Sequence, residues 1–161
     1  MNLLPYHSET LVSALSKPEV LGHLIRVTAE VNYLDVRTRG DHTILFNGMV
    51  GQKGFRISRK VDKGDTFLPL VLGHVEETPR GSIIFLKYRL FPGAIFFLAF
   101  WSLVLLSFTG YYFGVDQNYF YGGICLLLAI LNYGLALYFF NRQLKASRAI
   151  FYKLINFQLK D

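Results

Sequence analysis

The stretches GAIFFLAFWSLVLLSFTGYYF (residues 93–113) and YFYGGICLLLAILNYGLALYFF (residues 119–140) decide the fold of this chain. Each is about 21 residues long and has no charged side chain, and a helix of that length crosses a hydrocarbon core of about 30 Å. A buried pair of soluble helices would need more surrounding protein than the other segments supply. We therefore predict a transmembrane helical hairpin over residues 91–140, with polar residues 114–118 as its loop.

The charge distribution predicts how this hairpin is oriented. Residues 1–90 carry 12 basic and 9 acidic side chains, a net charge of +3, whereas the loop carries only Asp116 and residues 141–161 have a net charge of +4. Basic side chains concentrate on the cytoplasmic side of a membrane. We therefore expect a multi-pass protein of the inner (cytoplasmic) membrane with both termini in the cytoplasm. This topology explains the excess of basic over acidic side chains, so we do not expect a nucleic-acid partner.

Residues 1–90 are predicted to form a small cytoplasmic α+β domain. We expect two N-terminal helices, the first capped by Ser8 and running to Ser16, the second with Pro18 in its first turn. After Val27 the apolar residues alternate, which suits either a strand or a longer helix. Two antiparallel β-hairpins follow, predicted from the segments HTILFNGMV, GFRISRKV, TFLPLVLGHVEE and SIIFLKYRL.

The second span leads into a basic segment, residues 141–161, in which large apolar side chains alternate with Lys145, Arg148 and Lys153. This pattern predicts an amphipathic C-terminal helix that lies on the inner leaflet, docks on the N-terminal domain or contacts another copy. The many large apolar side chains favour docking or a contact between copies. The predicted fold is thus an antiparallel β domain with N-terminal helices, a transmembrane hairpin and an amphipathic C-terminal helix.

One sequence pattern suggests a family. The residues involved are turn glycines and core hydrophobes: Phe46, Gly48, Val50, Gly54, Phe55, Ile57, Phe67, Leu68, Pro69, Val71, Gly73, Val75, Glu77, Pro79 and Gly81. Followed by two membrane spans, this pattern resembles a set of small uncharacterised bacterial membrane proteins with a β-rich N-terminal domain. The resemblance covers roughly residues 44–113. It implies the architecture and no activity.

The sequence has no recognisable catalytic or metal-binding motif. His7, His23, His42 and His74 lack the spacing of zinc ligands, and the lone Cys125 lies within a span. His74 and Glu76 share a strand face, which we interpret as a solvated pair rather than as an acid–base couple. We therefore expect no enzyme activity, no catalytic residue, no cofactor and no bound metal.

Two groups of residues are candidates for function. Small and polar side chains of the spans are candidates for helix packing or, in an oligomer, for a pore: Ala99, Ser102, Thr109, Ala129 and Asn132. Asn132 and Ser102 should lie at similar depth, on stripes that include Gly122, Cys125 and Ala136. Basic side chains are candidates for contact with lipid headgroups: Lys53, Arg56, Arg59, Lys60, Arg142, Lys145 and Arg148.

These features predict a membrane-anchored, non-enzymatic binding or scaffold protein that forms a homo-oligomer. Its expected partners are the lipid bilayer, other copies of the chain, and a cytoplasmic protein or small-molecule ligand. The alternative is an oligomeric, channel-like membrane effector gated by its cytoplasmic domain. The absence of a linker between the last predicted strand and the first span would let a displacement of the sheet reach the spans.

Overall fold

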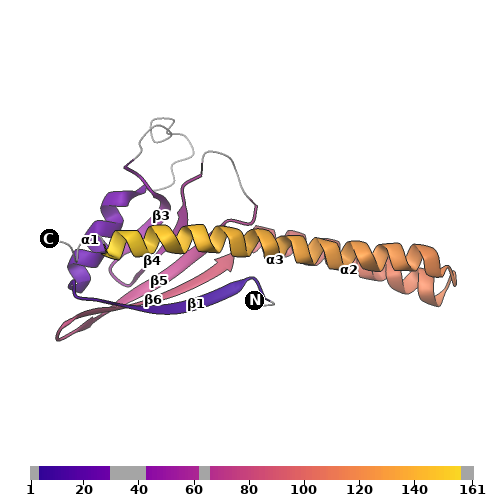
Figure 1. Ribbon diagram of the computed structural model, residues 1–161, viewed down its shortest axis with the longest axis horizontal. Helices are drawn as coiled ribbons and strands as arrows, with labels where there is room; N and C mark the ends of the chain where they lie inside the picture. The colour runs from indigo at the N-terminus through magenta and orange to yellow at the C-terminus, as the bar shows by residue number, and fades with distance from the viewer. Residues whose placement is uncertain (1–3, 30–42, 62–65, 157–161) are drawn as a thin grey trace.

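The computed structural model describes residues 4–29, 43–61 and 66–156. Over these residues the chain forms a six-stranded sheet and three helices, two of which extend away from the sheet as a long hairpin (Figure 1). The mixed α+β class is thereby confirmed. The hairpin helices are α2 (Pro92–Gly114) and α3 (Tyr119–Asn156).

The sheet has the strand order β1-β6-β5-β4-β3-β2. Neighbouring strands are antiparallel except for β2 and β3, which are parallel. Both predicted β-hairpins are confirmed, and Pro69, which cannot donate a ladder hydrogen bond, stands at the first residue of its strand. The strands are β1 (Tyr6–Ser13), β2 (Thr28–Ala29), β3 (Phe46–Gly51), β4 (Gly54–Arg59), β5 (Pro69–Thr78) and β6 (Gly81–Leu90).

The first of the two predicted N-terminal helices is wrong, because Tyr6–Ser13 forms the edge strand β1. All eight of its residues pair with β6, from Tyr6 opposite Arg89 to Ser13 opposite Ser82. Its side chains alternate between a more exposed and a more buried face, so Ser8 points outward and caps nothing. The pairing with β6, which is remote in sequence, outweighs the weak local helix signal.

The second predicted helix is confirmed as α1 (Lys17–Val27), with Pro18 in its first turn and the Ser16 N–H donating to Glu19 Oε2 at 2.8 Å. Val20 and Leu24 are buried against the sheet. The helix ends at Val27 and leads directly into β2, so the chain passes from one edge of the sheet, β1, to the other. The rest of the alternating segment lies outside the described residues.

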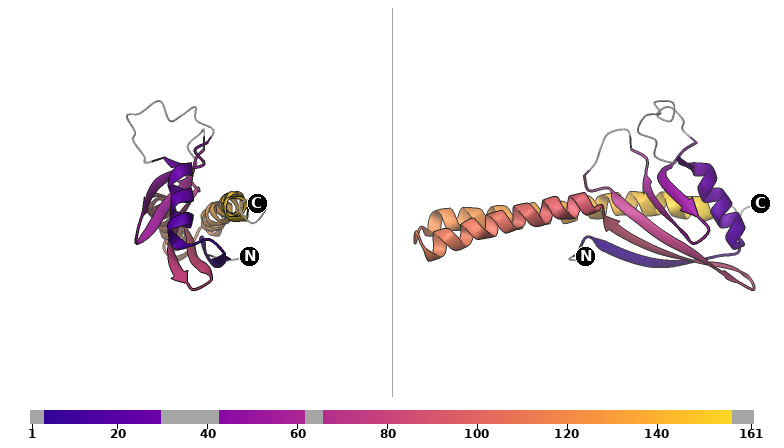
Figure 2. Two further views of the ribbon diagram at one scale, coloured as in Figure 1. Left: turned by 90° about the vertical axis from the view of Figure 1, so that its left-hand side faces the viewer. Right: turned by 180° about the vertical axis from the view of Figure 1, so that it is seen from behind.

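Helix α3 joins two parts of the predicted architecture. The second predicted span and the predicted C-terminal helix are one continuous helix, and residues 157–161 lie outside the described chain. Beyond the hairpin, α3 runs along the sheet on the same face as α1 (Figures 1 and 2). Its side chains Phe140, Leu144 and Phe151 belong to the hydrophobic core of the sheet. The C-terminal half of α3 is therefore docked on the domain, as the sequence favoured.

The junction between sheet and hairpin is short and has a buried residue on each side. Strand β6 ends at Leu90, which is fully buried, and α2 begins at Pro92. Ala94, in the first turn of α2, belongs to the same core as Phe140 of α3. Both helices of the hairpin thus leave the sheet as fixed continuations of its core.

Candidate functional site

The two hairpin helices pack through small side chains. On α3 the residues that face α2 include Gly122, Ala129 and Ala136, all buried, which confirms the predicted stripe. A Cβ atom at Gly122 would collide with the ring of Phe113 on α2. Glycine at this position therefore lets the helices approach closely beside their loop.

The predicted depth match of the two polar side chains is confirmed. Asn132 Nδ2 donates to Ser102 Oγ at 3.5 Å, a long hydrogen bond between two half-buried residues. Thr109 is buried, and its hydroxyl donates to Leu105 O of its own helix at 2.8 Å. The polar groups of these residues are thus paired within one hairpin.

One member of the predicted stripe on α2 is misplaced. Ala99 is exposed, whereas Leu98 is buried. At about 100° per residue, Leu98 lies on the same side of Ser102 as the buried Thr109, and Ala99 lies about 60° to the other side. The prediction followed steps of three and seven residues along α2, and the three-residue step from Ser102 back to Ala99 turns away from the contact with α3.

The hairpin loop is shaped by specific backbone contacts. Gln117 adopts a left-handed φ of 50°, and the N–H of Asn118 donates to Tyr112 O at 2.9 Å. Asn118 Oδ1 accepts from the N–H of Tyr121 at 3.3 Å, which caps the start of α3. The loop therefore closes both helix ends without a basic side chain.

Where α3 leaves the hairpin, its contact face changes from small to large side chains. Phe140 is fully buried and Phe151 is 1% exposed. The Phe151 ring stacks on Phe55 at 5.9 Å between centroids and meets the edge of Phe46 at 6.1 Å. The same face of α3 thus packs against α2 in the hairpin and against the sheet in its C-terminal half.

A polar cluster centred on Glu9 joins the edge strand β1 to α3. The Glu9 side chain is only 10% exposed, and its Oε2 lies 2.6 Å from Arg148 Nη2. Tyr88 on β6 donates to Glu9 Oε1 at 2.7 Å, and Tyr152 donates to Glu9 Oε2 at 3.1 Å. The carboxylate is therefore satisfied by three side chains from two elements.

The cluster also fixes ionisation states. Burial, followed by the hydrogen bond to Glu9, raises the pKa of Tyr88, so the phenol stays protonated as a donor. The hydrogen bond to Glu9, followed by that to Tyr152, raises the pKa of Arg148. Sequence analysis missed Glu9, although an acidic side chain on the inward face of an alternating strand is a signal for a buried charge pair.

The predicted headgroup-contact residues are found in several different surroundings. Arg148 is the ion-pair partner of Glu9, and Arg59 Nη2 donates to Gln143 Oε1 at 2.6 Å. Both therefore help to dock α3. Arg142 and Lys145 are exposed on α3 shortly after Phe140, and Lys53 and Arg56 are exposed on the first β-hairpin. Lys60 is half-buried next to Arg59.

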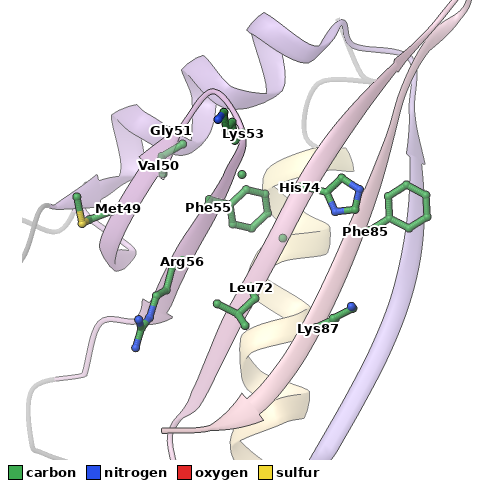
Figure 3. A pocket seen from close by; sticks show the side chains of 12 residues that line it. Met49, Val50, Gly51, Lys53, Phe55, Arg56, Leu72, His74, Phe85 and Lys87 are labelled. Carbon is green, nitrogen blue, oxygen red and sulfur yellow. The ribbon is translucent and has the colours of Figure 1, made fainter. Parts of the chain in front are cut away.

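Lys53 and Arg56 belong to an open hollow on the sheet face opposite α3, here called the basic hollow (Figure 3). Its volume is about 630 Å³. Its floor and sides come from β3, the β3–β4 turn, β4, β5 and β6: Met49, Val50, Gly51, Lys53, Gly54, Phe55, Arg56, Leu72, Gly73, His74, Phe85 and Lys87. Three of these side chains are cationic and none is acidic.

The histidines that the structure describes do not gather into a metal site. Over residues 4–29, 43–61 and 66–156, no group of three potential ligands has the arrangement that holds a metal ion. His74 Nε2 lies 3.1 Å from Glu76 Oε1, and both side chains are about half exposed. They form the predicted solvated pair; His42 lies outside the described residues.

Comparison of the chain with protein-family models, with curated proteins and with solved structures found no match. The hairpin, the docked helix and the basic hollow are thus the features from which function must be argued.

Proposed function

We propose that the protein is a membrane-anchored, non-enzymatic binding module that acts as a homo-oligomer. In this proposal the hairpin spans the inner membrane, and the sheet and both termini lie in the cytoplasm. The basic side chains that flank the hairpin on the sheet side, together with the acidic Asp116 in its loop, support this orientation. The proposal assigns recognition to the sheet domain and anchoring to the hairpin.

The observation that carries this proposal is the continuity of α3. The helix has 38 residues and is therefore about 57 Å long. About 33 Å of that length belongs to the hairpin, enough to cross a hydrocarbon core, and about 24 Å is docked on the sheet. A membrane anchor that also completes the core of a folded domain holds that domain in one orientation at the membrane.

The exposed surface of the hairpin supports a membrane. Phe96 is 73% exposed, Leu103 is 66% exposed and Phe120 is 72% exposed. Both helices pass the length and hydropathy criteria for a membrane span. Water-exposed apolar surface on this scale is atypical of a soluble monomer, and lipid together with neighbouring copies would cover it.

Cysteine labelling tests the proposed topology. In a Cys125→Ser background, Asp116→Cys places a thiol in the hairpin loop and Glu76→Cys places one in the sheet. We expect a membrane-impermeant maleimide to label Asp116→Cys in intact cells with a permeabilised outer membrane, and Glu76→Cys only after lysis. Labelling of Glu76→Cys alone would reverse the orientation, and recovery of the protein in the soluble fraction would contradict the membrane proposal.

The mass of the gently extracted protein tests the oligomer. A defined multimer in detergent supports the proposal, and a monomer at all protein concentrations contradicts that part of it. The exposed bulky residues of α2, including Phe97 and Trp101, offer a surface for contact between copies.

A second candidate function, a membrane effector gated by its sheet domain, is favoured by the junction at Leu90 and Pro92. No flexible linker separates β6 from α2, so movement of β6 would displace the span. However, Ser102 and Asn132 point at each other inside one hairpin, which weakens their case as pore-lining residues. Ion flux through proteoliposomes that contain the purified oligomer would support this second function; an ion-tight membrane would rule it out.

A further inference from the structure

The basic hollow owes its shape to two glycines. Gly51 and Gly54 face each other at the end of the β3–β4 ladder. They leave the sheet surface beside His74 without a side chain. Gly54 approaches β5 so closely that a Cβ atom there would lie 2.7 Å from Gly73 O and 3.5 Å from His74 Cβ. The close approach of β4 to β5 therefore requires glycine at position 54, and the missing side chain leaves the space open.

His74 presents a flat surface to this space. One face of its imidazole stacks on Phe85, with ring centroids 4.8 Å apart and an angle of 11° between the planes. The β3–β4 hairpin lies on the other side of His74 (Figure 3). Glu76 Oε1 contacts Nε2 at 3.1 Å and holds the ring in this orientation. A planar ligand group can therefore stack on the open face of the imidazole above Gly54.

The cations of the hollow are available to a ligand. Arg56 and Lys87 flank Leu72 in one row across three strands, and Lys53 lies at the β3–β4 turn (Figure 3). Across the described residues, none of these three side chains has an ion pair or a hydrogen bond to another side chain. They are exposed and able to reorient, so they can close on a phosphate group, which arginine and lysine both bind well.

We propose that the basic hollow binds a soluble phosphorylated ligand that carries a planar ring, the chemical class to which nucleotides belong. The ring stacks on His74, and the phosphates are bound by Arg56, Lys87 and Lys53. The volume of the hollow, about 630 Å³, lies within the range typical of small-molecule binding pockets. The carboxylate of Glu76 is already engaged with His74.

The sheet register argues for a soluble ligand rather than a lipid headgroup. His74 pairs with Phe85, which stands five positions before the buried junction residue Leu90. At about 3.3 Å per residue, the stacking surface is about 16 Å from the start of the hairpin, beyond a headgroup layer about 5–7 Å thick. This step rests on the proposed function, because it takes the hairpin as the membrane anchor.

Binding is tested with the full-length protein in nanodiscs of neutral lipid. Isothermal titration with ATP and with GTP should show saturable binding, whereas adenosine and inorganic triphosphate should each bind at least about ten-fold more weakly. Nanodiscs that contain anionic lipid should leave ATP affinity nearly unchanged at physiological ionic strength. Loss of ATP binding in anionic nanodiscs would identify a headgroup site and overturn the inference, as would the absence of binding by both nucleotides at millimolar concentration.

Variants separate the two halves of the site. Arg56→Ala and Lys87→Ala should each weaken ATP binding about ten-fold or more, because each removes a charge-assisted contact. Arg80→Ala, in the exposed turn after β5, removes the same charge and should have no effect. His74→Ala should bring the affinity for ATP down to that for inorganic triphosphate. Equal binding of ATP and triphosphate by the unmodified protein would mean that only a cationic surface is present.

A filling variant gives a steric test. Gly51 has no positive φ, and its nearest neighbour to a new Cβ is Gly54 O at 3.6 Å, so Gly51→Leu is compatible with the fold. We expect it to abolish ATP binding while the circular dichroism spectrum and the labelling of Asp116→Cys stay unchanged. Unchanged ATP binding in Gly51→Leu would overturn the site. The labelling readout also separates this failure from failure of the membrane proposal.

Discussion

The two halves of α3 use the same helix face for different purposes. In the hairpin, Gly122, Ala129 and Ala136 let a neighbouring helix approach closely. On the sheet, Phe140, Leu144 and Phe151 fill the core of a domain. In the proposed membrane location there is little hydrophobic drive between the hairpin helices, so their packing depends on close approach, whereas the sheet half gains from removing large apolar surfaces from water. The comparison predicts that substitutions in the sheet half cost more stability than those in the hairpin half.

The largest effect should come from Phe151→Ala. The side chain is 1% exposed and contacts the rings of Phe46 and Phe55, so its removal should destabilise the sheet domain by about 3–5 kcal/mol. Hydrogen exchange of the β4 amides reports this loss. Leu131→Ala, at a 48% exposed position in the hairpin half, is the control and should leave that exchange unchanged. Equal effects of the two substitutions would remove the distinction between the halves.

Glu9→Gln should have the next largest effect. It removes the carboxylate that Arg148, Tyr88 and Tyr152 share, at a cost of about 2 kcal/mol in the free energy of unfolding, since Arg148 remains partly solvated. The double variant Glu9→Gln/Arg148→Met should lose less than the sum of the two single variants. Strict additivity would show that the ion pair contributes nothing to docking of α3.

Alkaline pH should loosen the sheet half selectively. The pKa of Tyr88 is raised in the folded state, so above the ordinary value of about 10 the unfolded chain loses this proton first. The contribution of protonated Tyr88 to the free energy of unfolding is thus complete below pH 10. It is lost above that pH, with a slope of about 1.4 kcal/mol per pH unit. Unfolding measured between pH 10 and 12 should approach this slope, and Tyr88→Phe should flatten it. An unchanged slope in Tyr88→Phe would contradict the assignment.

The hairpin half is tested by a pair of adjacent glycines. Gly122→Ala places a methyl group against the ring of Phe113 and should cost about 1–2 kcal/mol, seen as faster hydrogen exchange of amides near the loop. Gly123→Ala meets no atom within 4 Å and should not destabilise the hairpin. If both variants behave alike, close approach of the helices at Gly122 is not required.

Asn132→Ala should have the smallest effect. The hydrogen bond to Ser102 is 3.5 Å long, and such bonds between membrane helices contribute about 0.6 kcal/mol. Hairpin stability should therefore change by less than it does in Gly122→Ala. A loss of the oligomer in Asn132→Ala would instead show that this side chain acts between copies.

The difference between the halves also explains what the sequence could predict. The hairpin depends on local patterns: the apolar lengths, the stripe that contains Ala129 and the depth match of Asn132 with Ser102 can all be counted along the chain. The sheet half depends on partners that are remote in sequence. Glu9 and Arg148 are 139 positions apart, and β1 becomes a strand only because β6 pairs with it.

The basic hollow was predictable only in part. The cations Lys53 and Arg56 were recognised on the β3–β4 hairpin, but Lys87 and the stacked rings of His74 and Phe85 come from the neighbouring strands. These side chains lie on one face of the sheet because of the register of three strand pairs. A shift of one residue in a strand would turn its side chains to the other face. The sequence alone does not fix that register.

The measurement that tests the central claim most directly is the distance between two spin labels on α3 in a lipid bilayer. In a Cys125→Ser background, labels at Leu127→Cys and Lys153→Cys occupy exposed positions on the hairpin half and the sheet half. In samples diluted with excess unlabelled protein, so that distances between copies do not contribute, a continuous helix predicts a single narrow distance distribution near 39 Å. A broad distribution or a clearly shorter distance would show that α3 is broken between its hairpin half and its sheet half, and the rigid coupling of the proposed anchor to the sheet would be wrong.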